Sequence, residues 1–178
     1  MQSSINAGNK DVARHILVID DNDSIHGDFR KVFGSDEHSD KLAGAKAALF
    51  GDAAPTAKSA ALFEVDSASQ GHEGLAKLQD ALRQGKPYAV AFVDMRMPPG
   101  WDGVETIQKL WEVDPDLQVV ICSAYSDYTS EQIAAKLRLA EPMPMLKKPF
   151  DPVEVMQLAT TLSTKSSQRR QDSASAPR

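Results

Sequence analysis

The segment "YAVAFVDMRMPPGWDG", residues 88–103, carries the clearest indication of the fold. A nearly continuous apolar run ends at one acid, Asp94, and a loop rich in proline and glycine follows. Such a run is typical of a strand covered on both faces, as in a parallel sheet. The segments "HILVI" (15–19) and "LQVVIC" (117–122) show the same pattern, and "LFEVDSA" (62–68) and "PMLK" (144–147) are weaker strand candidates. The sequence therefore predicts five strands.

Each predicted strand is followed by apolar residues at helical spacing. These residues are Ile25, Phe29 and Val32; Leu75, Leu78 and Leu82; Val104, Ile107 and Trp111; Ile133 and Leu137; and Val155, Leu158 and Leu162. The pattern is a strand and a helix repeated five times. Because crossovers between parallel strands are right-handed, the helices are expected on both faces of an open parallel sheet. This predicts an α/β three-layer domain.

We expect this domain to span residues 14–165 of the 178-residue chain. The flanking segments 1–13 and 166–178 are polar and poor in bulky residues, so they are predicted to be disordered, the second as a tail or a linker. Between the first helix and the second strand, an insertion at about 34–61 is longer than usual connections. Helical spacing of Leu42, Ala45 and Leu49 predicts a short added helix there, which either shields a sheet edge or forms a docking surface.

Composition excludes several classes of function. The formal net charge is −5, from 20 Lys and Arg against 25 Asp and Glu, so direct nucleic-acid binding is not expected. Cys122 is the only cysteine, which excludes an intramolecular disulfide and a cysteine-based zinc site. Neither a signal peptide nor a run of membrane-spanning length occurs. We therefore expect a cytoplasmic protein with no membrane partner.

Polar residues follow the predicted strands at the rim where parallel strands end together. They are Asp20 and Asp21 after the first strand, Asp94 after the third, Ser123 after the fourth, and Lys147 and Lys148 after the fifth. Functional groups of open parallel sheets collect at this rim. Each residue alone has an ordinary explanation, such as capping the next helix. Their convergence favours a functional site.

Three acids at one rim predict a bound cation. Two carboxylates about 4 Å apart repel by roughly 4 kcal/mol at an effective dielectric constant near 20. A divalent cation neutralises this repulsion, and all-oxygen ligands favour a hard ion such as Mg²⁺. The predicted metal ligands are Asp20, Asp21, Asp94 and the backbone carbonyl near Arg96.

Magnesium beside a carboxylate, a lysine and a hydroxyl is typical of phosphoryl transfer. Asp94 stands alone at its strand end, which favours it as the nucleophile that forms an aspartyl phosphate. Lys148 and Ser123 are placed to contact the oxygens of the phosphoryl group.

The segments "ILVIDDN", "VDMRMPPGWDG", "VVICSA" and "KKPF", in this order, strongly resemble the receiver domain of two-component response regulators. The resemblance covers about residues 14–165 and implies a CheY-like, flavodoxin-like fold with strand order 2-1-3-4-5. It also implies that Asp94 accepts a phosphoryl group from a histidine kinase or phosphotransfer protein. Asp21 would bind Mg²⁺ directly and Asp20 through water, while Ser123 and Lys148 would contact the phosphoryl group.

Three features depart from the family pattern. Met145 occupies the position where an aromatic switch residue is usual, the loop after Asp94 is one residue longer, and the insertion precedes the second strand. The loop "MPPGWDG" and the insertion resemble a subgroup of receivers often joined to sensor kinases or nucleotide-signalling output domains.

The leading hypothesis is a phosphorylatable signalling module that switches its binding to a downstream protein. It is not expected to be an enzyme, although it assists its own phosphorylation and dephosphorylation. A homodimer is left open. One alternative is a phosphohydrolase that forms an aspartyl phosphate, although Arg96 occupies the place of its usual second acid. The other is a receiver-like binding module that takes no phosphate, which the full set of acids, Ser123 and Lys148 disfavours.

Overall fold

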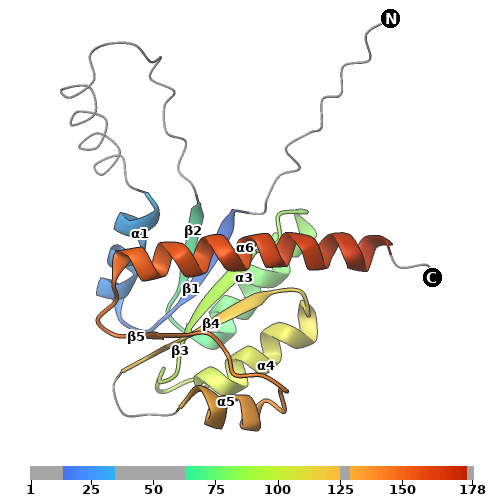
Figure 1. Cartoon of the computed structure of the whole chain (residues 1–178). Coiled ribbons are helices and arrows are strands. Elements are labelled where there is room, and N and C mark those ends of the chain that lie inside the picture. Colours follow the sequence, from blue (N-terminus) through green and yellow to red (C-terminus); the bar gives the residue numbers. More distant parts are fainter. Residues whose placement is uncertain (1–13, 35–62, 125–128, 176–178) are drawn as a thin grey trace, which may run out of the picture.

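The structure is a computed structural model that describes residues 14–34, 63–124 and 129–175. Five parallel strands form one sheet in the order β2-β1-β3-β4-β5 (Figure 1). The strands are β1 (His15–Ile19), β2 (Glu64–Ala68), β3 (Val90–Asp94), β4 (Gln118–Ser123) and β5 (Met145–Lys147). The predicted flavodoxin-like fold and its strand order are confirmed.

The apolar strands are continuous because both faces of the sheet are covered. Along β1, Ile16 and Val18 enter one core, whereas Leu17 and Ile19 enter the other. All four side chains are almost fully buried. This double burial accounts for the absence of apolar and polar alternation in the strand.

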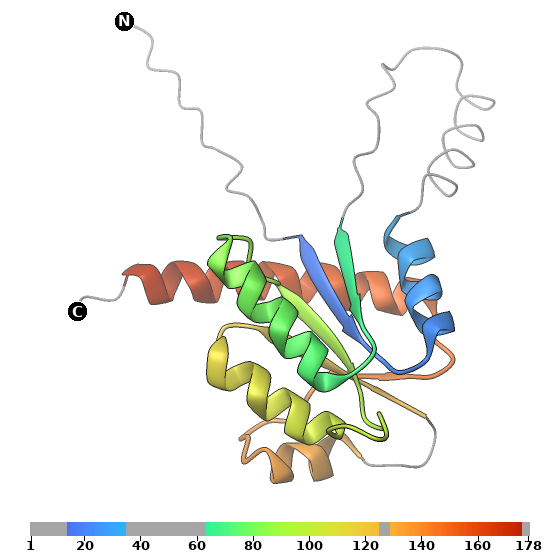
Figure 2. The same ribbon diagram turned by 180° about the vertical axis from the view of Figure 1, so that it is seen from behind.

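Helices cover the two faces of the sheet in separate layers. They are α1 (Asp23–Phe33), α3 (Gly71–Arg83), α4 (Gly103–Val113), α5 (Ser130–Lys136) and α6 (Pro152–Ser175). Helices α1 and α6 pack on one face, and α3, α4 and α5 pack on the other (Figures 1 and 2). The result is the predicted three-layer arrangement.

Side chains at the carboxyl rim start the helices that follow the strands. Asn22 caps α1 by accepting a hydrogen bond from the Ser24 backbone N–H at 3.0 Å. Asp102 caps α4 in the same way, at 2.8 Å from the Glu105 backbone N–H. These caps satisfy backbone donors that the helices leave unpaired, and they fix where each loop of the rim ends.

The structure corrects the expectation of a disordered tail from residue 166. Helix α6 continues to Ser175, well beyond Leu162, the last residue of its apolar pattern. Arg170 holds this extension by donating at 2.6 Å to the buried carboxylate of Asp114 and at 3.0 Å to the backbone carbonyl of Tyr88. Polar contacts therefore order a segment whose composition predicted disorder.

Two other expectations lie outside the described residues. They are the N-terminal tail at 1–13 and the helix expected around residues 42–49 of the insertion. Among the helices that the structure describes, none is long and apolar enough to cross a membrane.

Candidate functional site

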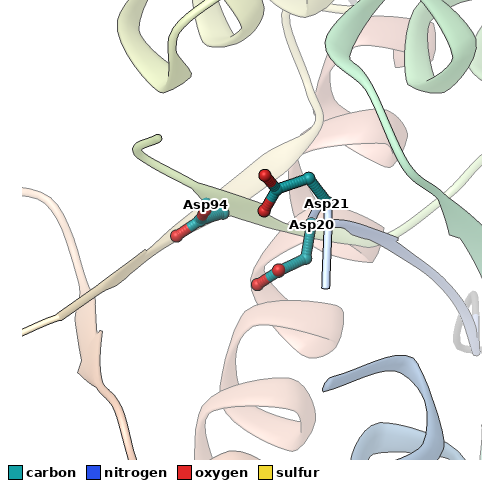
Figure 3. Close-up of side chains that lie close together, drawn as sticks. All are labelled: Asp20, Asp21 and Asp94. Atoms are coloured by element: carbon teal, nitrogen blue, oxygen red, sulfur yellow. The ribbon is translucent and has the colours of Figure 1, made fainter. Parts of the chain in front are cut away.

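Three aspartates meet at the carboxyl rim of the sheet. Asp20 and Asp21 follow β1, and Asp94 ends the neighbouring strand β3 (Figure 3). One carboxylate oxygen from each lies within 4.8 Å of the other two. Asp20 and Asp94 are buried, at 1% and 7% exposure, whereas Asp21 is exposed. The site is therefore a buried pair of acids with a third acid at its solvent side.

Lys148 joins the two buried acids. Its ammonium group donates to Asp20 Oδ2 at 2.6 Å and to Asp94 Oδ1 at 3.0 Å. The backbone N–H of Lys148 donates to the Ser123 carbonyl at 3.0 Å, which extends the β4–β5 pairing by one residue. Strand pairing thus carries this lysine to the acids, and one positive charge partly offsets three negative charges.

Ser123 reaches the same rim at the end of β4. In the strand register Cys122 lies opposite Asp94, so Ser123 stands one position farther along. The serine is buried, and its hydroxyl group donates to the Ala124 carbonyl at 2.9 Å. The hydroxyl group is therefore at the predicted strand end but bonds to backbone.

The surroundings of Asp94 disfavour its charge. Burial raises the pKa of Asp94, and the negative charge of Asp20 raises it further. The positive charge of Lys148 lowers this pKa by less, so the pKa stays raised. For Lys148, burial lowers the pKa, but hydrogen bonds and attraction to Asp20 and Asp94 outweigh burial and leave that pKa raised. The lysine is thus held as a cation beside two acids that are short of solvation.

The loop after Asp94 folds back onto the end of β3. The Gly103 backbone N–H donates to the Met95 carbonyl at 3.2 Å, and Met97 is buried. A Cβ at Gly103 would lie 2.6 Å from the Asp94 carbonyl oxygen, so only glycine fits this approach. Arg96 lies on the same loop with an exposed side chain.

Two further residues lie near the acid site or at a position that the sequence singled out. Met145 lies in β5 opposite Ile121, is partly buried, and packs against the core on the α3–α5 face. His26 in α1 is buried, and its Nε2 lies 2.8 Å from the Asp20 carbonyl oxygen. Only the helical period of α1, which turns His26 and Phe29 to one side, could have indicated this contact.

The donor set fits a hard divalent cation. The acids offer oxygen atoms only, at spacings that one ion can bridge, and two of them are buried and short of compensating charge. Cys122, the buried thiol in the β4 segment of this rim, is kept neutral because burial raises its pKa well above the ordinary value. Oxygen ligands with this charge match Mg²⁺ better than a soft metal.

Comparison with protein families places the chain in one family. The model for the response regulator receiver domain matches residues 54–160, more than half of the chain. The fold and the matched segment define a receiver domain of two-component response regulators. The chain belongs to the response regulator receiver domain family. The matched residues include Asp94, Ser123 and Lys148, whereas Asp20 and Asp21 precede them.

Solved structures show the same fold at low sequence identity. A CheY-like receiver domain protein from Methanospirillum hungatei JF-1 is 16% identical, with a TM-score of 0.60, and covers 88% of this chain and 98% of its own. A chain of the CheX–CheY–BeF3–Mg²⁺ complex from Borrelia burgdorferi is 19% identical, with a TM-score of 0.58; the match covers 83% of this chain and 87% of that chain. A structure named adenylate cyclase from Rhodopirellula baltica is 20% identical, with a TM-score of 0.60; the match covers 90% of this chain and 95% of that chain. No curated protein matches the chain.

Proposed function

We propose that this receiver domain carries a phosphorylation switch on Asp94. The observation that supports it most strongly is the buried pair of Asp20 and Asp94 joined by the Lys148 ammonium group, beside the exposed Asp21. Such a site presents one carboxylate with a cation beside it, which is the arrangement that phosphoryl transfer to a carboxylate needs. A histidine kinase or a phosphotransfer protein is the proposed donor.

In the proposed reaction, an Asp94 carboxylate oxygen attacks phosphorus of a phosphohistidine. The new O–P bond forms as the P–N bond breaks, and the imidazole leaves with the electron pair. Lys148 stabilises charge on the phosphoryl oxygens from its position 3.0 Å from Asp94. Ser123 supplies a hydroxyl donor after it exchanges its bond to the Ala124 carbonyl.

Asp20, Asp21 and Asp94, with the Arg96 backbone carbonyl, are proposed to hold Mg²⁺. When bound, the ion neutralises the acids and the incoming phosphoryl oxygens. Asp21 would bind it directly, and Asp20 through water. The exposure of Asp21 supports an entry path from solvent.

Phosphorylation is proposed to change which downstream protein the domain binds. New contacts from Ser123 and Lys148 to the phosphoryl group would bias a two-state surface near β5. Met145 lies in that strand and is only partly buried, so a flexible thioether would repack where the family usually places an aromatic ring. A cytoplasmic setting is part of the proposal and agrees with a buried, free Cys122.

The proposal is tested by incubating the protein with acetyl phosphate and measuring its intact mass. We expect one added phosphoryl group that forms with Mg²⁺ and does not form when EDTA is present from the start. An unchanged mass at saturating Mg²⁺ and acetyl phosphate would reject phosphorylation. Multiple-turnover phosphate release from small phosphomonoesters is not expected, because Arg96 lies two positions after Asp94 and offers no second carboxyl group.

A further inference from the structure

Gln70 contacts the loop that follows Asp94 from a different part of the fold. It stands at the N-terminus of α3, in the turn after β2, yet its side chain does not cap that helix. Its Nε2 instead donates to the Pro98 carbonyl at 3.4 Å. The helix start is served by Glu73, which accepts a hydrogen bond from the Ser69 backbone N–H at 2.8 Å. The amide of Gln70 is therefore committed to the neighbouring loop.

The same side chain fills the space beside Gly100. A Cβ at Gly100 would lie 2.3 Å from Gln70 Oε1, and this oxygen is buried with no hydrogen-bond partner among the described residues. The loop is a tight turn at this point, since the Gly100 backbone N–H donates to the Met97 carbonyl at 3.1 Å. The Gln70 amide thus lies across the turn, with one end on Pro98 and the other against Gly100.

Contacts on the α3 side extend this fit between the two loops. A Cβ at Gly71 would lie 2.2 Å from Thr106 Oγ1 and 3.1 Å from the Trp101 ring. His72 meets the Trp101 ring edge to face, with ring centroids 6.4 Å apart. The N-terminus of α3 therefore fits closely against the loop after β3 and the first turn of α4.

The loop after Asp94 is held against the end of β3 at both of its ends. It leaves from Asp94, includes Arg96, and returns at Gly103 against the Met95 backbone. Met97, between these points, is buried. Because the Gly100 backbone N–H bonds to the Met97 carbonyl, a shift of the turn at Pro98 to Gly100 would pull on Met97, the residue that follows the Arg96 carbonyl.

We propose that Gln70 is a positioning residue of the phosphorylation site. Its amide holds the turn at residues 97–100 and so sets the loop backbone beside Asp94 for the bound cation. This inference rests on the proposed phosphorylation of Asp94. It adds a residue from the β2–α3 turn to a site otherwise built from β1, β3, β4 and β5.

The test measures the labelling rate by acetyl phosphate as a function of Mg²⁺ concentration, in the full chain. We expect Gln70→Ala to raise the half-saturating Mg²⁺ concentration about tenfold, as the loss of groups that orient metal ligands generally does. Gln70→Glu keeps the length but cannot donate to Pro98, so the same shift is expected. Gln108→Ala, at an exposed position of α4, is the matched control and should equal the wild type.

Gly100→Ala supplies a second, independent readout. In the chain that keeps Gln70, the new methyl group collides with the amide, so the half-saturating Mg²⁺ concentration should rise. In the Gln70→Ala background the amide is gone and the space is open, so the same change should add little. Such dependence of one substitution on the other indicates direct contact between the two positions. Melting temperatures of all variants, measured without Mg²⁺, show whether they are folded.

The outcomes separate the inference from the proposal beneath it. A labelled wild type with an unchanged Mg²⁺ dependence in Gln70→Ala would overturn the role of Gln70 and leave phosphorylation intact. Equal effects of Gly100→Ala in both backgrounds would also overturn it. A wild type that takes no label at any Mg²⁺ concentration would reject the proposed function, and the inference with it.

Discussion

Lys148 donates a hydrogen bond of 2.6 Å to Asp20 although 128 positions of sequence separate them. The same ammonium group lies 3.0 Å from Asp94. Two buried acids therefore share one cation, and the third acid, Asp21, has its carboxylate within 4.8 Å of theirs. Like charges at such distances repel strongly where solvent is scarce. The Lys148 ammonium group offsets part of the repulsion among the three carboxylates. The remaining negative charge favours binding of a divalent cation.

Removal of the shared cation should destabilise the protein. Lys148→Met leaves Asp20 and Asp94 buried without their shared cation, and breaking a buried ion pair costs about 3 kcal/mol. Urea unfolding in Mg²⁺-free buffer measures this loss, and added Mg²⁺ should restore part of it. Lys31→Met is the control, because Lys31 is exposed and its change should stay within about 0.5 kcal/mol. Equal unfolding free energies for the two variants would contradict this reading of Lys148.

Asp94→Asn should raise the melting temperature in Mg²⁺-free buffer at neutral pH. Because the folded protein raises the pKa of Asp94, the ionised form is disfavoured there relative to the unfolded chain. That group's contribution is fully present at low pH and is lost as pH rises through the raised pKa. The advantage of the variant should therefore appear between acidic and neutral pH and be absent in acid. A variant less stable than the wild type at neutral pH would show that the Lys148 contact dominates instead.

Mg²⁺ should stabilise the wild type. At about 100 times the dissociation constant, a ligand adds roughly 2.7 kcal/mol. For a domain of this size, that corresponds to a rise of roughly 5–10 °C in melting temperature. Asp21→Asn should remove most of this rise while leaving the Mg²⁺-free protein little changed, because Asp21 is exposed. Asp172→Asn, at an exposed position near the end of α6, should respond to Mg²⁺ as the wild type does. An unaltered Mg²⁺ response in Asp21→Asn would exclude Asp21 as a ligand.

Arg170→Ala should destabilise the protein and loosen the end of α6. The substitution leaves the Asp114 carboxylate, 4% exposed, without its ion-pair partner, at a cost of about 3 kcal/mol. Hydrogen exchange should speed up in α6 beyond Leu162. Arg169→Ala, at the adjacent exposed position, should change stability by less than about 0.5 kcal/mol. Similar exchange in the two variants would mean that Arg170 does not hold the extension.

The fold was predictable from the sequence because buried positions are occupied by apolar residues in recognisable patterns. Strands covered on both faces read as continuous apolar runs, as in β1 and β3, and helices read as apolar residues at a period of 3.6. The end of α6 shows no such apolar pattern, because it is held by a hydrogen bond from Arg170 to the Tyr88 carbonyl rather than by apolar side chains. A partner that lies distant in sequence cannot be inferred from local composition.

The convergence of site residues was predictable because parallel strands end at one rim. Asp20, Asp21, Asp94 and Lys148 come together as expected, and their roles remain proposals. The contacts of His26 and Gln70 were not foreseen, since they depend on helix rotation and on the fit between two loops. The hydrogen bond from the Ser123 hydroxyl group to the Ala124 carbonyl could not be predicted from the sequence either, because a serine hydroxyl can rotate among several acceptors.

The most direct test of the central claim is to locate the phosphoryl group on the chain. Protein treated with acetyl phosphate and Mg²⁺ is reduced with borohydride, which converts an aspartyl phosphate into homoserine, and is then digested and sequenced by mass spectrometry. We predict homoserine at position 94 in the wild type and none in Asp94→Asn. Homoserine at another aspartate, or none at any position, would contradict the assignment of Asp94 as the phosphoacceptor.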